Sequence, residues 1–314
     1  MSFKNTALYS FARRIHSFIF GTYSRYFEKT KNKWSPEKRV KMLMRIYEIN
    51  MGHRFDIRKP VLFTEKIQWY KEFYRPGGLI NVVDKYLFKE YIRSKLGEGY
   101  TIPLYGAWTD LRSLENDWPQ LPEKFVLKST LQGDGKCVKI IRDKNGVDLG
   151  SLKKELAEWL DPKKVLINSF CSAYHEGVPR ILAEEYMEEV DNQLYDYKFF
   201  CFGGRPHCIY VAIDHFPGQL SKISFYDLGW KRLDVRYGEH PVNDIAKPKH
   251  YDEMLKIAEK LSAGFPFVRV DFFDTSEKLY VAELTLYPGG GFTHYHPESF
   301  DKELGDLFQL PEGY

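Results

Sequence analysis

Apolar residues recur at helical spacing through the first third of the chain. The stretch WSPEKRVKMLMRIYEINMG places them on one face between Ser35, whose hydroxyl suits an N-cap, and Gly52, which favours a helix end. FTEKIQWYKEFY repeats the pattern and stops at RPGG, so the first 80 residues are predicted to be mostly helical. A third helix is expected to open at Asp84 in DKYLFKEYIRSKLG.

Short apolar runs typical of strands replace this period further along the chain. KFVLK and CVKII are separated by STLQGDGK, which predicts a hairpin with a long tip. RILAEEYM indicates a buried strand, and YKFFCF and HCIYVAI form a second hairpin around GGRP. KISFYD and WKRLDV are expected to extend that sheet, and FVRVDFF is expected to pair with KLYVAELTL.

Two further helices lie among these strands, SLKKELAEWL from Ser151 and YDEMLKIAEKLSAG. Strands and helices thus come in clusters and do not alternate strictly. Because such grouping is typical of α+β proteins, we predict an α+β fold with mainly antiparallel sheets.

The charge of the chain is unevenly distributed. The net charge is +3, but residues 1 to 100 hold 21 Lys and Arg against 9 Asp and Glu, and the remainder holds 25 against 34. A basic first third can meet membrane phosphates, a polyanionic substrate or nucleic acid, or it can be a solvated face. FKNTALYSFARRIHSFIF is amphipathic, and either lies on an anionic membrane or docks on its own domain.

The four cysteines form no CxxC pair and no zinc spacing. Most of them lie in apolar runs, so we expect buried reduced thiols and a cytosolic protein. No signal peptide is evident, and the longest early apolar piece is far shorter than the roughly 20 residues that span a bilayer.

Candidate phosphate-binding groups gather around the first hairpin. Its tip, TLQGDGK, fails the Walker pattern because Lys136 is followed by Cys137 and a strand. The tip is either a plain turn or a loop whose N–H groups cover phosphates. Lys128 at the end of the preceding strand and Lys85 near a helix start are candidate phosphate ligands, with an ordinary surface lysine as the alternative for each.

Candidate metal ligands come near the end of the chain. Asp271 in FVRVDFF and Glu283 in VAELTL belong to two neighbouring predicted strands, and a tight turn would bring them side by side. Magnesium takes few protein carboxylates and fills its shell with phosphate oxygens or water. Arg269 is expected on the same face as Asp271, either in an ordinary ion-pair network or to stabilise negative charge during group transfer.

Taken in order along the chain, these motifs resemble one family. DKYLFKEYI, KFVLKSTLQGDGK, RILAEEYM, DYKFFCFGGRP and RVDFF followed by ELTLYPGGG resemble the TupA-like branch of the ATP-grasp ligases, from about residue 35 to the end. The resemblance implies two mainly antiparallel sheets with flanking helices that hold ATP between them. It also implies three parts: a basic helical segment (1–80), a subdomain with the glycine hairpin (81–183) and a subdomain with the metal site (184–314).

The resemblance also implies roles for individual residues. The nucleotide-binding set comprises the phosphate ligands, the hairpin glycines, the connection at adenine and ribose, and a lysine of the next strand: Lys85, Lys128, Gly133, Gly135, Glu184, Glu185, Tyr186, Met187 and Lys198. Asp271, Glu283 and Thr285 would hold Mg²⁺; Thr285 stands where relatives commonly have asparagine, so the number of metal ions stays open. Arg269 and Lys128 would act on the transferred phosphate, and the Gly290 N–H would stabilise the oxyanion.

The implied activity is an ATP- and Mg²⁺-dependent ligation of a carboxylate to an amine through an acyl phosphate. One substrate would be a uronic acid or amino acid unit of a bacterial surface polysaccharide, with a polyanionic glycan or sugar nucleotide among the partners and no nucleic acid. Residues 1–30 either dock on their own domain, the more common case for such a segment, or contact an anionic membrane from the cytoplasm. A glycosyltransferase, despite the lack of a DxD-like pair, and a non-catalytic nucleotide-binding module stay open as alternatives. His294 and His296 either contact substrate or lie on the surface, with a second metal site less favoured.

Overall fold

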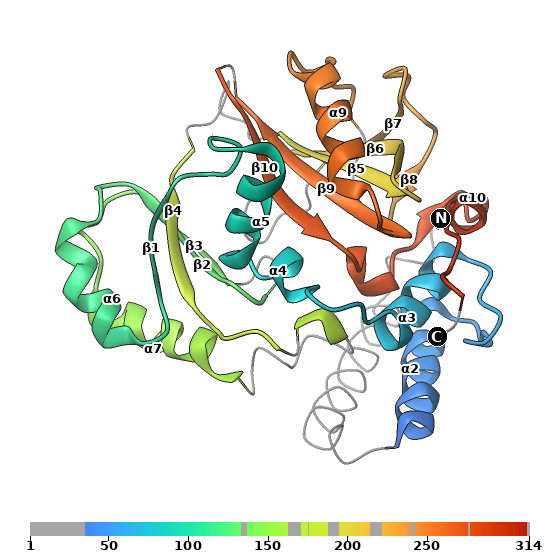
Figure 1. Cartoon of the computed structure of the whole chain (residues 1–314), viewed down its shortest axis with the longest axis horizontal. Helices are drawn as coiled ribbons and strands as arrows, with labels where there is room; N and C mark the ends of the chain where they lie inside the picture. Colours follow the sequence, from blue (N-terminus) through green and yellow to red (C-terminus); the bar gives the residue numbers. More distant parts are fainter. Residues whose placement is uncertain are drawn as a thin grey trace, which may run out of the picture.

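A computed structural model gives the architecture of the chain (Figure 1). It describes residues 35–132, 137–162, 171–174, 176–187, 195–213, 222–238, 240, 243–275 and 277–312. Segment 1–30, for which membrane contact and docking on its own domain are the alternatives, and the two hairpin glycines, Gly133 and Gly135, lie outside the described residues.

The predicted helices of the first third are present. They are α2 (Pro36–Met51), α3 (Phe63–Phe73), the single turn α4 (Ile80–Val83) and α5 (Leu87–Leu96). Ser35 caps α2 by accepting from the Lys38 N–H, and Gly52 ends it with a φ of 81°. α5 begins later than expected, at Leu87, because Asp84 lies before it and accepts from the Tyr86 and Leu87 N–H groups at 2.8 and 3.0 Å.

The smaller sheet has four antiparallel strands in the order β1-β4-β2-β3. They are β1 (Leu104–Trp108), β2 (Phe125–Ser129), β3 (Val138–Ile141) and β4 (Ile181–Glu185). The β2–β3 hairpin is as predicted, whereas β1 was not foreseen. Helices α6 (Leu111–Asp117) and α7 (Leu149–Leu160) cover one face, with η3 (Trp118–Gln120) after α6. The expected start of α7 at Ser151 is wrong, because Asp148 caps the helix by accepting from the Gly150 and Ser151 N–H groups.

The larger sheet has five antiparallel strands in the order β10-β9-β5-β6-β7. They are β5 (Asp196–Phe202), β6 (Arg205–Ile213), β7 (Lys222–Asp227), β9 (Phe267–Asp274) and β10 (Leu279–Thr285). Both predicted hairpins are present. The expected strand WKRLDV is wrong: it adds only one bridge, Tyr226 to Arg232. The chain turns at Trp230, which has a φ of 64° and stacks its ring on Tyr226 at 4.6 Å.

Two short strands and two single helical turns lie outside these two sheets. β8 (Arg236–Tyr237) pairs with β11 (Tyr295–His296), and the turns are η5 (Ser172–Tyr174) and η6 (Pro288–Gly291). Cys171, Cys201 and Cys208 are buried, as predicted, whereas Cys137 is half-buried; none of the four forms a disulfide. Among the described helices, none has the length and apolar character that a bilayer span requires.

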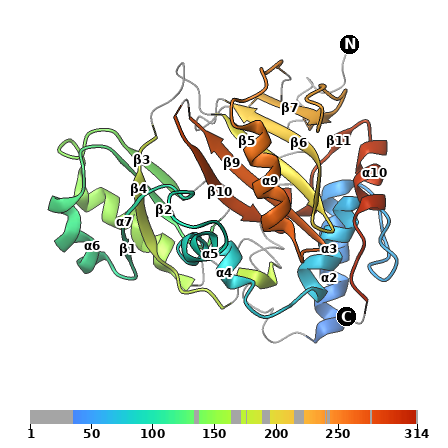
Figure 2. The same cartoon turned by 45° about the horizontal axis from the view of Figure 1, so that its top comes forward.

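Helices cover both faces of the five-stranded sheet (Figure 2). α9 (Tyr251–Ser262) packs on one face, as its apolar period predicts. The other face is divided along the strands. Its aromatic half packs against α3 and α10 (Ser299–Leu307) through rings of Phe63, Phe200, Phe202, Phe267 and Phe308. Its polar half carries the residues described next.

Candidate functional site

The two predicted metal-binding acids face each other across one hairpin. Glu283 of β10 pairs with Asp271 of β9, and Thr285 pairs with Arg269. A β-bulge between Val281 and Glu283 precedes this pairing, and β10 continues two residues beyond Glu283. The side-by-side placement predicted from sequence is therefore present. Asp271 is 1% exposed, whereas Glu283 is partly exposed.

Arg269 lies on the same face as Asp271, as alternation along a strand predicts. Its Nε and Nη2 donate to the two carboxylate oxygens of Asp271 at 2.7 and 2.5 Å. Nη1 donates to the Tyr210 hydroxyl and Nη2 also donates to the Thr285 hydroxyl, both at 3.1 Å. The guanidinium is thus fixed on three sides and buried. Such a two-pronged contact sets orientation as well as charge.

Lys198 links Asp271 to a further acid that sequence reasoning did not single out. Its ammonium donates to Asp271 Oδ2 at 2.7 Å and also contacts Asp196 Oδ2. Burial raises the pKa of Asp271, but the Arg269 and Lys198 charges outweigh burial and leave that pKa below its ordinary value. Burial dominates at Asp196, whose pKa is raised and whose Oδ1 has no hydrogen-bond partner among the described residues.

Lys85 connects the helical region to the acids of the large sheet. Its Nζ lies 3.8 Å from Glu283 Oε1 and donates to the Gln132 carbonyl at 2.7 Å. Its backbone N–H donates to the Thr130 carbonyl just after β2. Lys85 is therefore held at the junction of α5, the β2 hairpin and β10, and one lysine of the front half does meet one acid of the back half.

Lys128 lies on the face of β2 opposite the apolar core that faces α6 and α7. It contacts Glu184 Oε2 at 2.6 Å, and Lys89 of α5 contacts Glu184 Oε1 at 2.5 Å. Burial raises the pKa of Glu184, but the two ammonium groups lower it by a larger amount, so its pKa lies below the ordinary value. This buried acid is thus ionised and neutralises part of the lysine charge.

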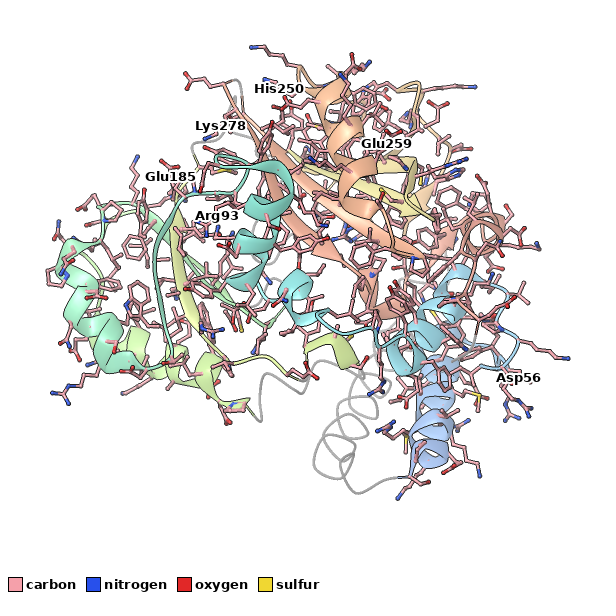
Figure 3. The ribbon with its side chains drawn as sticks, in the orientation of Figure 1. Asp56, Arg93, Glu185, His250, Glu259 and Lys278 are labelled. Atoms are coloured by element: carbon pink, nitrogen blue, oxygen red, sulfur yellow. The ribbon has the colours of Figure 1, made fainter. Side chains whose placement is uncertain are left out.

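The predicted adenine connection begins at the end of β4. Glu185 closes the strand, and its N–H donates to the Pro103 carbonyl at 3.0 Å. Tyr186 and Met187 follow, both half-buried, with Arg142 over the Tyr186 ring at 5.8 Å. Glu185 forms no ion pair with another described residue, unlike Glu184. Figure 3 shows Glu185 at the upper end of β4 and Lys278 at the upper end of the β9–β10 hairpin.

Residues 289–291, here called the triglycine loop, follow β10. Their φ angles are 56°, 62° and 70°, which glycine adopts without strain. The Gly290 N–H, which the sequence suggested as an oxyanion donor, donates to the Tyr287 carbonyl at 2.9 Å. Its predicted role would therefore require this bond to open. His294 and His296 are exposed, and His294 Nε2 lies 3.1 Å from the Asn50 carbonyl.

The donor set near Glu283 fits a magnesium ion that arrives with a nucleotide. Asp271, Glu283 and Thr285 offer hard oxygen ligands on paired positions. Within the described ranges there is no cluster of three or more Asp, Glu, His or Cys that would hold a metal by itself. Magnesium is commonly bound through one or two carboxylates, with substrate phosphates completing its shell. Two carboxylates beside lysines match that pattern.

Three residues of this network were not predicted from sequence: Lys89, Asp196 and Tyr210. Lys89 is four residues after Lys85 and Asp196 is two residues before Lys198, so helical and strand periods would place each beside its predicted neighbour. Tyr210 offered no comparable signal, since it comes from β6, whose register with β5 was not known.

A five-stranded antiparallel sheet with paired acids on its last hairpin, next to a four-stranded sheet whose Lys128 shares Glu184 with Lys89 of α5, is an α+β fold of the ATP-grasp type. The model of the TupA-like ATP-grasp family matches residues 65–309. The chain belongs to this family, and the resemblance drawn from the motifs is confirmed. No curated protein gave a significant match.

Solved structures of ATP-grasp proteins resemble this chain. D-alanine–D-alanine ligase from Bacillus anthracis is 20% identical, with a TM-score of 0.44 over 72% of this chain and 66% of that chain. The Helicobacter pylori ligase is 16% identical, with a TM-score of 0.39 over 73% and 61%. A RimK domain ATP-grasp protein from Sphaerobacter thermophilus is 8% identical, with a TM-score of 0.40 over 73% and 67%. This chain spans less than two thirds of the length of either D-alanine ligase.

Proposed function

We propose that the chain is an ATP- and Mg²⁺-dependent ligase that joins a carboxylate to an amine. A carboxylate oxygen attacks the γ-phosphorus of ATP, the bond to the β-phosphate oxygen breaks, and ADP leaves with the bond electrons. The amine nitrogen then attacks the acyl carbon, phosphate leaves, and the amine proton passes to solvent. Membership of the ATP-grasp family and the meeting of Lys85 with Glu283 support this reaction class.

The lysines supply positive charge for the triphosphate. Lys128 and Lys89 share Glu184 near the end of β4, and Lys85 lies beside Glu283 near the end of β10. Three ammonium groups therefore lie beside these two acids and neutralise part of their charge. Bound phosphates would compete with these carboxylates for the same hydrogen-bond donors. An ammonium gives a point charge without fixed geometry, which suits a substrate that moves during transfer.

Arg269 would face the negative charge that develops during transfer. Its guanidinium is held by Asp271, Tyr210 and Thr285 before any substrate arrives, so little reorganisation is needed at the moment of reaction. Asp271 and Glu283 would hold Mg²⁺, with the Thr285 hydroxyl as a third oxygen. The metal, when bound, neutralises phosphate charge.

The substrate class rests on the family and on charge. The TupA-like resemblance favours a uronic acid or amino acid unit of a bacterial surface polysaccharide as the carboxylate. The first hundred positions hold 21 basic and 9 acidic residues, and this net positive charge suits a polyanionic glycan or sugar nucleotide. The same charge would favour contact with the inner face of an anionic membrane from the cytoplasm.

One observation carries the proposal. Lys85 and Glu283 are nearly two hundred positions apart in the sequence, yet Lys85 Nζ lies 3.8 Å from Glu283 Oε1, beside the Arg269–Asp271 pair. The test is ADP release across a panel of amines and uronic or amino acids with MgATP. We expect release only when both an amine and a carboxylate are present, and a loss of more than about ten-fold in Glu283→Gln.

A matched control comes from the same hairpin. Glu277 is exposed in the turn between β9 and β10, so Glu277→Gln removes an equal charge away from the site and should keep full activity. Turnover of a sugar nucleotide without ADP release would instead favour a glycosyltransferase. Nucleotide binding without turnover, together with an intact biological role in Lys128→Ala and Glu283→Gln, would favour a non-catalytic module.

A further inference from the structure

Lys71 of α3 is a fully buried lysine whose partners are all neutral. Its side chain is 0% exposed. The ammonium contacts the Gly290 carbonyl, donates to Gln68 Oε1 at 3.0 Å and lies 4.6 Å from the centre of the Phe292 ring. No carboxylate of a described residue lies within ion-pair distance of it.

The groups around Lys71 explain why its charge is costly. The adjacent Glu72 is directed to Arg39 of α2 at 3.1 Å, and on η5 the Ser172 hydroxyl donates to the Lys71 carbonyl. Among the residues that the structure describes, the Cys171 thiol just before η5 is the titratable group that acts on Lys71, since its thiolate would raise the pKa of the lysine. Burial lowers the pKa of Lys71 to about 8. A buried lysine without a carboxylate costs folding stability, whereas a methionine would pack there without that cost.

Lys71 and its neighbour Gln68 bind the triglycine loop. The Gln68 amide donates to the Gly290 and Gly291 carbonyls at 3.1 and 2.8 Å, and Lys71 contacts the Gly290 carbonyl from the next turn of the helix. Gly291 is packed so closely that an added Cβ would lie 2.3 Å from Gln68 Nε2. Two side chains of one helix thus fix the carbonyl side of the loop.

The loop they hold lies next to the proposed metal ligands. Thr285 ends β10, and Pro288, Gly289, Gly290 and Gly291 form η6 three residues later. An ammonium bond to a carbonyl is charge-assisted and stronger than a neutral one. α3 comes from the basic helical segment, which therefore completes the site from outside the two sheets.

We propose that Lys71 is a positioning residue: its ammonium holds the Gly290 carbonyl and thereby sets the triglycine loop to receive the carboxylate-bearing substrate beside Glu283 and Thr285. This role rests on the proposed ligase function. Lys71 does not touch the reacting atoms and acts through the loop.

A first experiment tests the hold on the loop without any substrate. Amide hydrogen exchange is followed in the full chain for the peptide that contains Gly290 and Phe292, whose N–H groups bond to Tyr287 and Gly289. Because opening of the loop uncovers Lys71 and lets its pKa return toward the ordinary value, wild-type protection, corrected for intrinsic rates, should rise as pH rises through about 8. Lys71→Met should lose about ten-fold of the protection at neutral pH and show no such step.

Two further variants make the exchange result decisive. Lys71→Gln keeps a donor but cannot titrate, so its protection should not vary with pH, and it serves if Lys71→Met folds poorly. Lys66 on the same helix donates to the Gly305 and Phe308 carbonyls at 2.7 and 2.8 Å, away from the loop, and Lys66→Met should keep the wild-type step. Wild-type protection in Lys71→Met, or loss of the step in Lys66→Met, would overturn the proposal.

A second experiment links the loop to catalysis once a carboxylate and amine pair is found by ADP release. Lys71→Met should raise KM for the carboxylate about ten-fold and leave KM for MgATP unchanged. Equal effects on both KM values would contradict a positioning role at the loop. If no substrate pair works in the wild type, the ligase proposal fails, and the exchange experiment still decides whether Lys71 holds the loop.

Discussion

Replacing Arg269 with lysine removes the two-pronged contact at the centre of the candidate site. The guanidinium makes four hydrogen bonds, two to Asp271 and one each to Tyr210 and Thr285. A lysine keeps the charge but is a single point donor on a different stem, so it cannot reach both carboxylate oxygens and both hydroxyls. Asp271 would retain Lys198 as a partner at 2.7 Å.

The expected cost follows from the bonds that are lost. At least two of the four bonds are lost in Arg269→Lys, and each involves a charged group in a buried site. A hydrogen bond to a charged group contributes about 1.5–3 kcal/mol, so the loss of two should lower the free energy of unfolding by about 3–6 kcal/mol. Since Lys198 still pairs with Asp271, the acid is not left without a counter-charge.

Urea denaturation followed by circular dichroism measures this change, with the midpoint and slope fitted separately. Tyr210→Phe removes one of the four bonds and should cost about 1.5–3 kcal/mol. Combined with Arg269→Lys, it should add little, because that bond is already lost. A loss below about 0.5 kcal/mol in Arg269→Lys would refute the claim that the guanidinium is fixed by its buried partners.

Three other changes test separate parts of the structure. Gly291→Ala should destabilise by about 1–3 kcal/mol in urea, because its φ is +70° and the new Cβ meets Gln68, and a stability equal to wild type would contradict the loop packing. Glu184→Gln should lower the free energy of unfolding at neutral pH. The folded pKa of Glu184 lies below its ordinary value of 4.5, so the difference in unfolding free energy between wild type and variant should stay constant above pH 4.5 and shrink as pH falls below it. In the wild type, the free energy of unfolding should rise by about 3 kcal/mol between the folded pKa of Lys71, near 8, and its ordinary pKa of 10.5, because the unfolded chain binds more protons in that range. Lys71→Met should show no such rise. Identical pH profiles of unfolding for the two proteins would contradict this.

Local sequence patterns determined much of the fold. Ser35 and Gly52 delimit α2 because cap chemistry is encoded in single residues, and the β9–β10 hairpin could be predicted because both strands carry strong apolar alternation. β1 was missed because LYGAW is short and half-exposed at a sheet edge, so its period is weak. WKRLDV failed for a different reason: Trp230 folds back on Tyr226, a contact between side chains that no strand period encodes.

The candidate site was predictable only where residues share an element. Arg269 and Asp271 are two positions apart on one strand, and Asp271 and Glu283 are joined by one hairpin, so local geometry brings them together. Lys71 was not foreseen, since an amphipathic helix pattern gives no sign that a lysine will be buried against a loop more than two hundred residues away. Such contacts depend on how whole elements pack.

We propose that Lys128, Lys89 and Lys85 hold the phosphates of a nucleotide whose magnesium lies at Asp271 and Glu283. Titration calorimetry of the full chain with ATP, with and without Mg²⁺, tests it most directly. We predict saturable one-to-one binding that needs Mg²⁺ and weakens by more than about ten-fold in Lys128→Met. Lys139→Met on the opposite face of the neighbouring strand, where the lysine pairs with Glu155, should bind like wild type. Absence of ATP binding in the wild type, or equal binding in both variants, would contradict the account.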